Sequence, residues 1–348
     1  MVSNEVFNQV NEVDLEKEDA LHLLKMNPYE LFTLANELCE KVNGNIATYV
    51  VNRNINFTNS CVGNCKFCAF RNDNGYVLST REILDKTGEA FDLGATEVCI
   101  QGGLLPGAGI MYYCEMLEDI KSNFHNIHIH AFSPMEVYHA ARNSNIDIED
   151  TLKELKRSGL DSMPGTAAEI LVDRVREIIC PNKLSSDLWV RVIKTAHNLG
   201  IPTTATMMYG HVETEEERIE HLLKIREIQR ATGGFTEFVP LPFLSKNTHL
   251  NGYKTRGLDN LRTLAIARII LHGYIKNIQV SWVKLGKELA KLSLFCGAND
   301  LGGTLMEENI SKSAGSIYGE YIKPEEFESM ISRVGRIPKK RSTLYELI

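Results

Sequence analysis

A (β/α)8 barrel of the TIM type is the fold that the sequence predicts. Short apolar or β-branched runs alternate with longer helical patterns over about 250 residues, without a linker or a change in composition. Eight such runs are candidate strands: residues 54–58, 97–101, 127–132, 160–163, 203–208, 235–239, 278–282 and 294–298. An unbroken alternation of strands and helices favours a closed barrel over the alternative, an open, doubly wound α/β sheet.

Signals for helix starts and ends lie between these runs. Glycine stands just before several candidate strands, where a helix commonly ends: Gly94, Gly159 and Gly200. In a capping box, a Ser or Thr and a Glu three residues later satisfy free backbone N–H groups at the start of a helix. Three helices open with this spacing: Ser79 with Glu82, Thr166 with Glu169, and Thr214 with Glu217. These signals place helices between the strands.

Both ends of the chain extend beyond the predicted barrel. The segment YELFTLANELCEKVNG, which precedes the first strand, has the periodicity of an amphipathic helix. We therefore expect a helical N-terminal extension over residues 1–45, the barrel over 46–310 and a helical C-terminal extension over 311–348.

Composition and charge exclude several classes of partner. The chain has 348 residues, a net charge of −7 and a pI of about 5.9. Its Lys and Arg residues form no long basic run, so neither nucleic acid nor an anionic membrane is an expected partner. The most apolar windows contain a charge and fall short of the roughly 18 residues that a membrane span needs. The N-terminus is polar and acidic, unlike a signal peptide, and we expect a cytoplasmic protein.

Three of the eight cysteines lie in one short polar segment, NFTNSCVGNCKFCAFRN. Cys61, Cys65 and Cys68 have the spacing C-x3-C-x2-C and come directly after the first predicted strand. That position is a βα loop at the face of a barrel where active sites lie. Three thiolates can bind three irons of a cubane 4Fe-4S cluster and leave the fourth iron without a protein ligand. Such an open metal position indicates a catalytic rather than a structural site.

Other interpretations of this segment fit the sequence less well. A structural zinc site needs a fourth Cys or His close by, and a plant-type ferredoxin has the spacing C-x4-C-x2-C with a distant fourth Cys. A chain of this length in the cytoplasm does not need a disulfide framework. We expect the other five cysteines to be buried or partly buried thiols: Cys39, Cys99, Cys114, Cys180 and Cys296.

The cysteine spacing, with the aromatic Phe67 before the last Cys, resembles the signature of the radical S-adenosylmethionine (SAM) superfamily. The resemblance implies that SAM binds the open iron through its amino and carboxylate groups, with Phe67 among the residues at the cofactor. It also implies that one electron from the cluster cleaves SAM to methionine and a 5′-deoxyadenosyl radical, and that a one-electron donor is a partner of the protein. The protein holds SAM and excludes competing reactions. An open iron of this kind is expected to make the protein sensitive to oxygen.

The resemblance implies SAM contacts on two further segments. Gly102 and Gly103 follow the second strand, where relatives offer the backbone carbonyls of a Gly-Gly pair to the SAM ammonium; an ordinary flexible turn is the alternative. Glu169 and Arg176 are seven residues apart, two turns along one face of a predicted helix. Relatives place a carboxylate and an arginine on this helix against SAM. Glu169 could instead serve only as the capping-box partner of Thr166.

Polar residues follow three other predicted strands, at the rim where barrel enzymes bind substrate. They are candidates for the substrate pocket, without assigned roles: His130, Ser133, Glu136, His211, Glu213, Asn299 and Asp300. A lone His or Glu is more often a hydrogen-bonded structural group than a catalyst, so both interpretations stay open at each position. No catalytic residue is assigned from the sequence.

Longer segments resemble one family, CofH, between about residues 48 and 316. They are YVVNRNINFTNSCVGNCKFCAFR, HAFSPMEV, LDSMPGTAAEIL, TATMMYGHVET, VPLPF and GANDLGGTLMEENIS. CofH is the tyrosine-using half of the synthase of 7,8-didemethyl-8-hydroxy-5-deazariboflavin, the deazaflavin chromophore of a hydride-carrying coenzyme.

The CofH resemblance implies a specific reaction. The deoxyadenosyl radical takes a hydrogen atom from the amino group of L-tyrosine, and the Cα–Cβ bond breaks to give 2-iminoacetate and a 4-hydroxybenzyl radical. That radical adds to C5 of 5-amino-6-(D-ribitylamino)uracil. A second radical SAM enzyme, CofG, then closes the ring. Because this chain has room for one barrel only, we expect CofG to be a separate companion polypeptide.

Alternatives with other chemistry remain. The futalosine-route enzymes of menaquinone synthesis share the barrel, the cysteine motif and a GAND-like stretch; activity with tyrosine and the ribityl uracil, against futalosine-type substrates, separates the two. A non-catalytic iron–sulfur or zinc protein would hold metal without responding to SAM. An ordinary barrel enzyme with incidental cysteines would keep its activity after Cys65→Ala.

Overall fold

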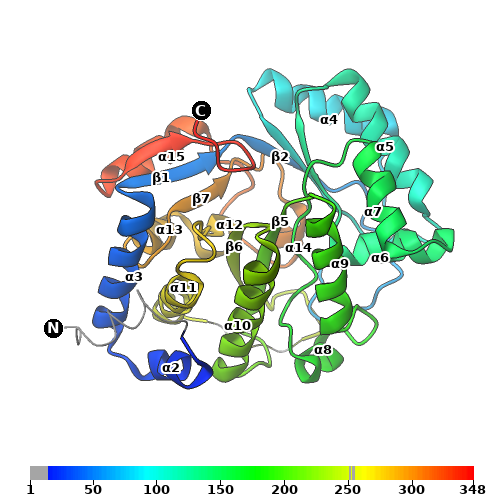
Figure 1. Ribbon diagram of the computed structural model, residues 1–348. Helices are drawn as coiled ribbons and strands as arrows, with labels where there is room; N and C mark the ends of the chain where they lie inside the picture. Colours follow the sequence, from blue (N-terminus) through cyan, green and yellow to red (C-terminus); the bar gives the residue numbers. More distant parts are fainter. Residues whose placement is uncertain (1–14, 251, 253–254) are drawn as a thin grey trace.

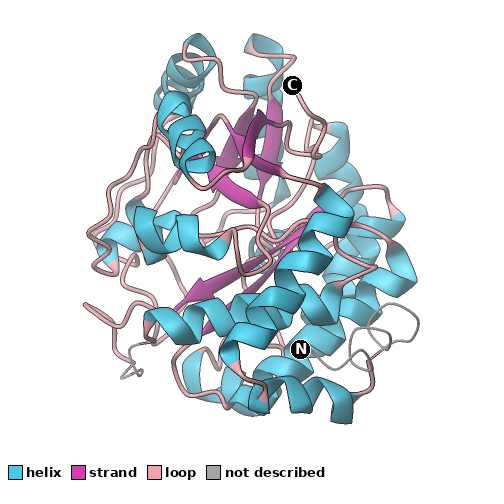
Figure 2. Cartoon of the chain, turned by 90° about the vertical axis from the view of Figure 1, so that its left-hand side faces the viewer, coloured by secondary structure: helices cyan, strands magenta, loops and turns pink. Residues whose placement is uncertain are grey.

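The computed structural model describes residues 15–250, 252 and 255–348. In this part of the chain the strands lie at the centre and helices surround them, as Figure 2 shows. The strands are β1 (Ile46–Val50), β2 (Asn52–Ile55), β3 (Glu97–Ile100), β4 (His128–Ala131), β5 (Thr203–Tyr209), β6 (Phe235–Pro242), β7 (Asp300–Gly303) and β8 (Ile337–Lys340). The helices between β2 and β6 are α4 (Thr80–Asp92), α5 (Ile110–Asn123), α6 (Pro134–Ser144), α7 (Ile148–Arg157), α8 (Asp173–Ile179), α9 (Ser186–Asn198) and α10 (Glu215–Thr232). Those after β6 are α11 (Gly257–Leu271), α12 (Trp282–Leu285), α13 (Lys287–Ser293), α14 (Asn309–Ser313) and α15 (Pro324–Arg333).

The strands form a closed ring of parallel neighbours, which confirms the predicted barrel. Regular pairing joins β2 to β3, β3 to β4, β5 to β6, and β7 to β1. Single bridges complete the ring through two short extended segments: His130 with Ser162, Met163 with Thr203, Phe238 with Ile278, and Gln279 with Asp300. Because β1 and β2 are successive halves of one strand, interrupted at Val51, β1 can pair with β7 while β2 pairs with β3.

Two of the predicted strands are misplaced. The eighth was expected over 294–298, but these residues form a turn after α13, and the strand is β7. Leu294 and Cys296 are buried in the apolar core. The apolar pattern that suggested a strand therefore indicates that these residues are buried, although their backbone is not extended. The first strand was expected over 54–58, whereas the chain is extended from the start of β1.

Helix starts follow the capping signals in part. The predicted capping boxes at the starts of α4 and α10 are confirmed. The third, Thr166 with Glu169, is wrong, because α8 begins only at Asp173 and Glu169 lies in a turn with a φ of 48°. A capping box that the sequence did not predict opens α6, formed by Ser133 and Glu136.

Both terminal segments pack on the outside of the barrel. Before β1, the helices α2 (Lys17–His22) and α3 (Pro28–Asn43) lie against α10 and α11 (Figure 1), and residues 1–14 of the predicted extension lie outside the described part. After residue 311 the chain forms α15, but also the strand β8, which pairs in parallel with β1. The predicted C-terminal extension therefore contains a helix and, in addition, a strand that the sequence did not predict, and the predicted segment boundaries stay predictions.

The apolar core fills the space between the outer faces of the strands and the helices. Ile55, Val98, Ile100 and Ile129 point outward from β2, β3 and β4 and are fully buried there. The burial of these apolar side chains holds the helices against the outside of the barrel. Alternate residues of the same strands point to the inside of the barrel. No helix in the described residues is long and apolar enough to cross a membrane.

Candidate active site

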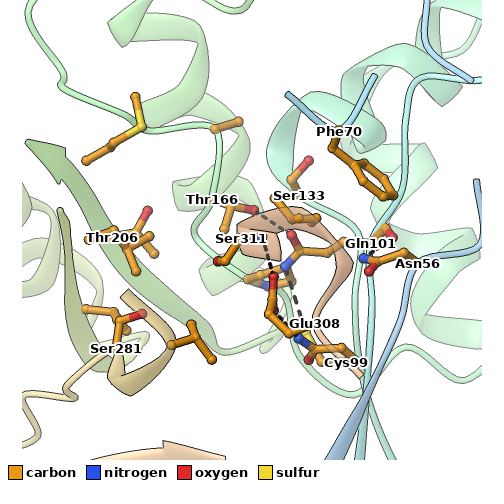
Figure 3. A pocket seen from close by; sticks show the side chains of 18 of the residues that line it. Asn56, Phe70, Cys99, Gln101, Ser133, Thr166, Thr206, Ser281, Glu308 and Ser311 are labelled. Carbon is orange, nitrogen blue, oxygen red and sulfur yellow. Dashed lines mark hydrogen bonds between the residues drawn. The ribbon is translucent and has the colours of Figure 1, made fainter. Parts of the chain in front are cut away.

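A cavity of about 430 Å³ lies inside the barrel and opens toward the cysteine loop. Every second residue of the strands faces it, because side chains alternate between the two faces of a strand. Many inward residues are polar, beside apolar ones such as Met208 and Val239: Asn52 and Asn54 in β2, Thr204 and Thr206 in β5, and Glu237 in β6, with the thiol of Cys99 in β3. Figure 3 shows Cys99, Gln101, Thr206 and Ser281 around this space. An interior of this kind is suited to a polar ligand.

The cysteine loop forms one wall of the cavity, and Cys61, Cys65 and Cys68 all line it. Backbone hydrogen bonds fix the loop to the barrel rim: the Val62 N–H donates to the Leu104 carbonyl at 3.0 Å, and the Leu104 N–H donates to the Cys61 sulfur at 3.2 Å. All eight cysteines are free thiols. Of the five others, Cys99 is half-buried and the remaining four are buried, as predicted.

The three cysteines fit a cluster better than a single ion. Among the described residues, no group of three or more His, Cys, Asp or Glu side chains could hold one metal ion. This finding disfavours a structural zinc site. A cubane cluster needs less convergence, because each cysteine binds its own iron. Three free thiols on a loop that faces an open polar cavity therefore have the donor chemistry for a 4Fe-4S cluster with one exposed iron.

Gly102 and Gly103 line the cavity beside the cysteine loop and leave no room for side chains. A Cβ on Gly102 would lie 2.7 Å from the Phe57 ring, and one on Gly103 would lie 2.2 Å from the Ser60 carbonyl oxygen. Their N–H groups are used, by Glu136 at 3.0 Å and by Thr58 at 2.8 Å. Neither glycine carbonyl accepts a hydrogen bond from the described residues, so both are available to a ligand.

Glu169 lines the cavity, but Arg176 does not. The Glu169 carboxylate pairs with Lys183 at 2.7 Å, and the Lys183 ammonium lies 5.0 Å from the centre of the Phe67 ring. The buried Arg176 guanidinium instead donates to the backbone carbonyls of Ala167, Ala168 and Leu184. The expectation that Glu169 and Arg176 share one helix face is therefore wrong: Arg176 holds the turn that carries Glu169.

His130, Ser133 and Glu136 line the cavity as expected. Burial lowers the pKa of His130 to about 4, so its ring is neutral at pH 7 and shares a hydrogen bond of 2.7 Å with Ser162. Burial raises the pKa of Glu136 to about 7. Its carboxylate closes the capping box with Ser133 and accepts the N–H of Gly102, so it joins the start of α6 to the glycine pair.

Four other candidates do not line the cavity, which corrects their assignment to the pocket: His211, Glu213, Asn299 and Asp300. Each is buried and engaged elsewhere. His211 and Glu213 bind backbone groups in the turn before α10, and Glu213 also binds Arg218. The Asn299 amide oxygen accepts from Arg268 at 2.8 Å. Asp300 acts on the cavity through residues that line it: its carboxylate binds Arg341 at 2.5 Å and accepts the N–H of Gly302 at 2.7 Å.

Sequence reasoning missed the floor of the cavity. Glu97, Glu237, Gln279 and Arg341 line it, and the hydroxyl of Tyr345 donates to Glu237. Alternating polar residues in the predicted strands could have revealed the two glutamates. No local pattern points to Arg341, because it comes from the C-terminal segment after β8 and reaches the barrel only in the folded chain.

Comparison with protein families gives two matches. Residues 55–225 match the radical SAM superfamily, and residues 232–348 match the CofH/MqnC C-terminal region.

The chain is similar over most of its length to characterised relatives. A 5-amino-6-(D-ribitylamino)uracil–L-tyrosine 4-hydroxyphenyl transferase of Methanosarcina acetivorans is 60% identical over 95% of this chain and 90% of the relative. A relative with the same description from Archaeoglobus fulgidus is 58% identical over 94% of this chain and 96% of its own.

Solved structures share the fold. Methylornithine synthase (PylB) matches 96% of this chain and 97% of its own with a TM-score of 0.74 and 18% identity. The [FeFe]-hydrogenase maturase HydG matches 97% of this chain and 75% of its own with a TM-score of 0.75 and 18% identity. At this level of identity, these likenesses show the fold alone.

Proposed function

This chain belongs to the radical SAM superfamily and, within it, to the family of 5-amino-6-(D-ribitylamino)uracil–L-tyrosine 4-hydroxyphenyl transferases, and from that premise we propose how its residues serve the reaction. It is a radical SAM enzyme that uses a 4Fe-4S cluster and SAM. It transfers the hydroxyphenyl-bearing part of L-tyrosine to the ribityl uracil in the synthesis of a deazaflavin coenzyme. The C-terminal family description also covers a menaquinone-pathway enzyme, and the identity to the transferases favours the deazaflavin reaction.

Cys61, Cys65 and Cys68 are the residues we assign to the cluster. When bound, the reduced cluster supplies the electron that cleaves SAM and starts the radical reaction. The three thiols would hold three irons of the cluster and leave the fourth for SAM, on the side of the loop that faces the cavity. Since the Val62 N–H donates to the Leu104 carbonyl and the Leu104 N–H donates to the Cys61 sulfur, two hydrogen bonds tie the cysteine loop to the segment after the glycine pair.

The glycine pair and the Phe67 side of the cavity suit SAM. The Gly102 and Gly103 carbonyls accept no internal hydrogen bond and can receive the SAM ammonium. Glu169 and Lys183 form a buried ion pair beside Phe67. Both side chains line the cavity, and each neutralises the charge of the other. Arg176 acts as a positioning residue, because it holds the turn that contains Glu169.

The polar inner faces of the strands suit the two organic substrates. A ribityl chain has several hydroxyls, and each must find a hydrogen-bond partner when it leaves water. Asn52, Glu97, Thr204 and Glu237 line the deeper part of the cavity and offer both donors and acceptors. His130 is neutral, so one ring nitrogen can donate while the other accepts. These side chains can orient the uracil and keep bulk water out of the radical reaction.

Two partners complete the proposal. The described part of the chain contains one barrel and one C-x3-C-x2-C loop, so ring closure falls to a separate companion enzyme of the CofG kind. The second partner is an external one-electron donor, because the electron that the cluster gives to SAM has to be supplied to the cluster first.

The observation that carries this function is the placement of three free cysteines at the mouth of a cavity that both polar and apolar side chains line. The test is anaerobic reconstitution with SAM, reductant, L-tyrosine and the ribityl uracil, read by mass spectrometry. We expect tyrosine-dependent 5′-deoxyadenosine and the benzylated uracil. Cys65→Ala should lose both, while Cys114→Ala, in a buried helix position away from the cavity, should keep them.

Three results would contradict the proposal. Deoxyadenosine formed without regard to tyrosine would point to futalosine-type substrates. If addition of SAM does not change the electron paramagnetic resonance signal of the reduced cluster, the result would support the non-catalytic alternative. Full activity of Cys65→Ala would make the cysteines incidental.

A further inference from the structure

Lys284 differs from the other cationic side chains of the cavity. Four Lys or Arg residues line the cavity, and three of them are paired with acids: Arg71 with Asp73 at 2.6 Å, Lys183 with Glu169 at 2.7 Å, and Arg341 with Asp300 at 2.5 Å. Within the described residues, the Lys284 ammonium forms neither a salt bridge nor a hydrogen bond. An unpaired cation is the feature of a cavity that most directly indicates an anionic ligand.

The surroundings of Lys284 favour a visiting anion. Burial lowers the pKa of Lys284, whereas the charges of Glu308 and Glu169 raise it without contacting it. Both carboxylates have other partners: Glu308 accepts from Asn54 and from the Ser311 N–H, and Glu169 binds Lys183. The Lys284 side chain is only partly exposed to water, and no direct contact neutralises its charge, so a ligand carboxylate would give it a partner.

A second polar group lies on the same short segment. Ser281 precedes α12 at the N-cap position, but its hydroxyl makes no capping hydrogen bond. It lines the cavity, and Figure 3 shows it facing the open space opposite Glu308. A hydroxyl and an ammonium three residues apart on one segment can both donate to one carboxylate.

We propose that Lys284, assisted by Ser281, binds the α-carboxylate of L-tyrosine in this cavity. The inference rests on the proposed function, which supplies tyrosine as substrate. SAM carries the same carboxylate chemistry, but the cysteine loop has a different cation beside it: the Lys183 ammonium lies 5.0 Å from the centre of the Phe67 ring in that loop. Lys284 lies instead on α12, just after the residues that bridge β6 and β7, and we assign it to tyrosine.

The test measures binding without turnover. Cluster-loaded enzyme with SAM and no reductant is dialysed against labelled L-tyrosine or tyramine, which has the same phenol and amine but no carboxylate. We expect wild-type enzyme to bind tyrosine about 10- to 100-fold more tightly than tyramine, since a charge-assisted contact is lost. In Lys284→Met that preference should fall to about 1, and in Lys284→Arg it should be kept in part.

A matched control and two contrary outcomes make the test decisive. Lys287→Met removes a partly exposed lysine three residues further on, which pairs with Glu326 and does not line the cavity, and it should leave tyrosine affinity unchanged. Equal binding of tyrosine and tyramine by wild-type enzyme would overturn the inference, and that measurement needs no variant. So would a Lys284→Met enzyme that keeps its preference but binds SAM more weakly, because Lys284 would then serve SAM. Wild-type enzyme that does not bind tyrosine at all would refute the proposed function instead.

Discussion

At the scale of single residues, the site is built from groups whose roles depend on what surrounds them. Glu169 and Arg176 have the same sequence signal, a charged residue in a predicted helix, but only Glu169 faces the cavity. The Arg176 guanidinium donates hydrogen bonds to the backbone carbonyls of Ala167 and Leu184 and does not face the cavity. Lys183 and Lys284 carry no motif, and the fold alone makes one a paired cation and the other an unpaired one.

Gly103 gives the sharpest residue-level prediction. In Gly103→Ala the new methyl group would lie 2.2 Å from the Ser60 carbonyl oxygen and 3.0 Å from the Cys61 Cβ. Because backbone atoms cannot swing aside, we expect the loop that carries Cys61 to shift, with a loss of about 1–3 kcal/mol in the free energy of unfolding. Iron content per chain after anaerobic reconstitution should fall, as measured by iron and sulfide analysis.

The control for this variant is Gly257→Ala at the start of α11. There the added Cβ would meet its nearest neighbour, Leu289, at 3.6 Å, which is an ordinary contact. Its iron content should equal that of the wild type. Normal iron loading in Gly103→Ala would mean that the cysteine loop tolerates the methyl group, and the close approach would not be what fixes Cys61.

At the scale of elements, the sequence was informative where a strand or helix follows local rules. The closed barrel, the cysteine loop and the capping boxes at Ser79 and Thr214 could all be predicted from spacing. The eighth strand could not, because its residues Asp300 to Gly303 look like a loop and become a strand only by pairing with β1. The residues at 294–298 look like a strand but are a buried turn. Pairing partners far along the chain decide such cases.

A histidine between three elements gives a prediction on pH. His197, in α9, shares hydrogen bonds with Thr203 of β5 at 2.8 Å and Thr232 of α10 at 2.6 Å. Burial lowers its pKa to about 4, below the ordinary 6.5. The unfolded chain therefore takes up this proton first as pH falls, so the stabilising contribution is complete above about pH 6.5 and is lost toward pH 4.

The measurement is the slope of stability against pH. From pH 7 to pH 5, the wild type should lose about 2 kcal/mol more of its free energy of unfolding than His197→Gln, which cannot take up the proton. Urea titrations at several pH values give both slopes. His125→Gln, at an exposed position, should keep the wild-type slope. Parallel slopes for the wild type and His197→Gln would show that His197 is not held neutral.

At the scale of the whole molecule, the C-terminal segment closes the barrel floor. After β8 pairs with β1, Arg341 enters the barrel and binds Asp300 of β7 at 2.5 Å and Glu237 of β6 at 3.5 Å. The Tyr345 ring lies 3.9 Å from the Arg341 guanidinium. The sequence could not predict these contacts, because Arg341 is about 100 residues from Glu237 and about 40 residues from Asp300, and no local pattern links them. The C-terminal segment, which was predicted to lie outside the barrel, therefore also supplies residues to the floor of the cavity, among them Arg341.

Replacement of Arg341 tests whether this floor depends on charge balance. Arg341→Leu leaves the carboxylates of Asp300 and Glu237 buried without their cation, so we expect a loss of about 3–5 kcal/mol in the free energy of unfolding at pH 8. Burial already raises the pKa of Glu237 to about 7, and Arg341 is the charge that lowers it. Without Arg341 that pKa should rise further, and the folded variant should bind protons that the folded wild type does not.

The deficit of Arg341→Leu should therefore shrink as pH falls from 8 to 5, because protonation removes the unpaired charge of Glu237. Urea titrations across this range measure it, with Lys339→Leu, an exposed position on β8, expected within about 0.5 kcal/mol of the wild type. A deficit that stays constant with pH would mean that Arg341 contributes packing and not charge. A deficit that shrinks would show that two strands and the C-terminal segment, distant in sequence, share one electrostatic unit beneath the substrate cavity.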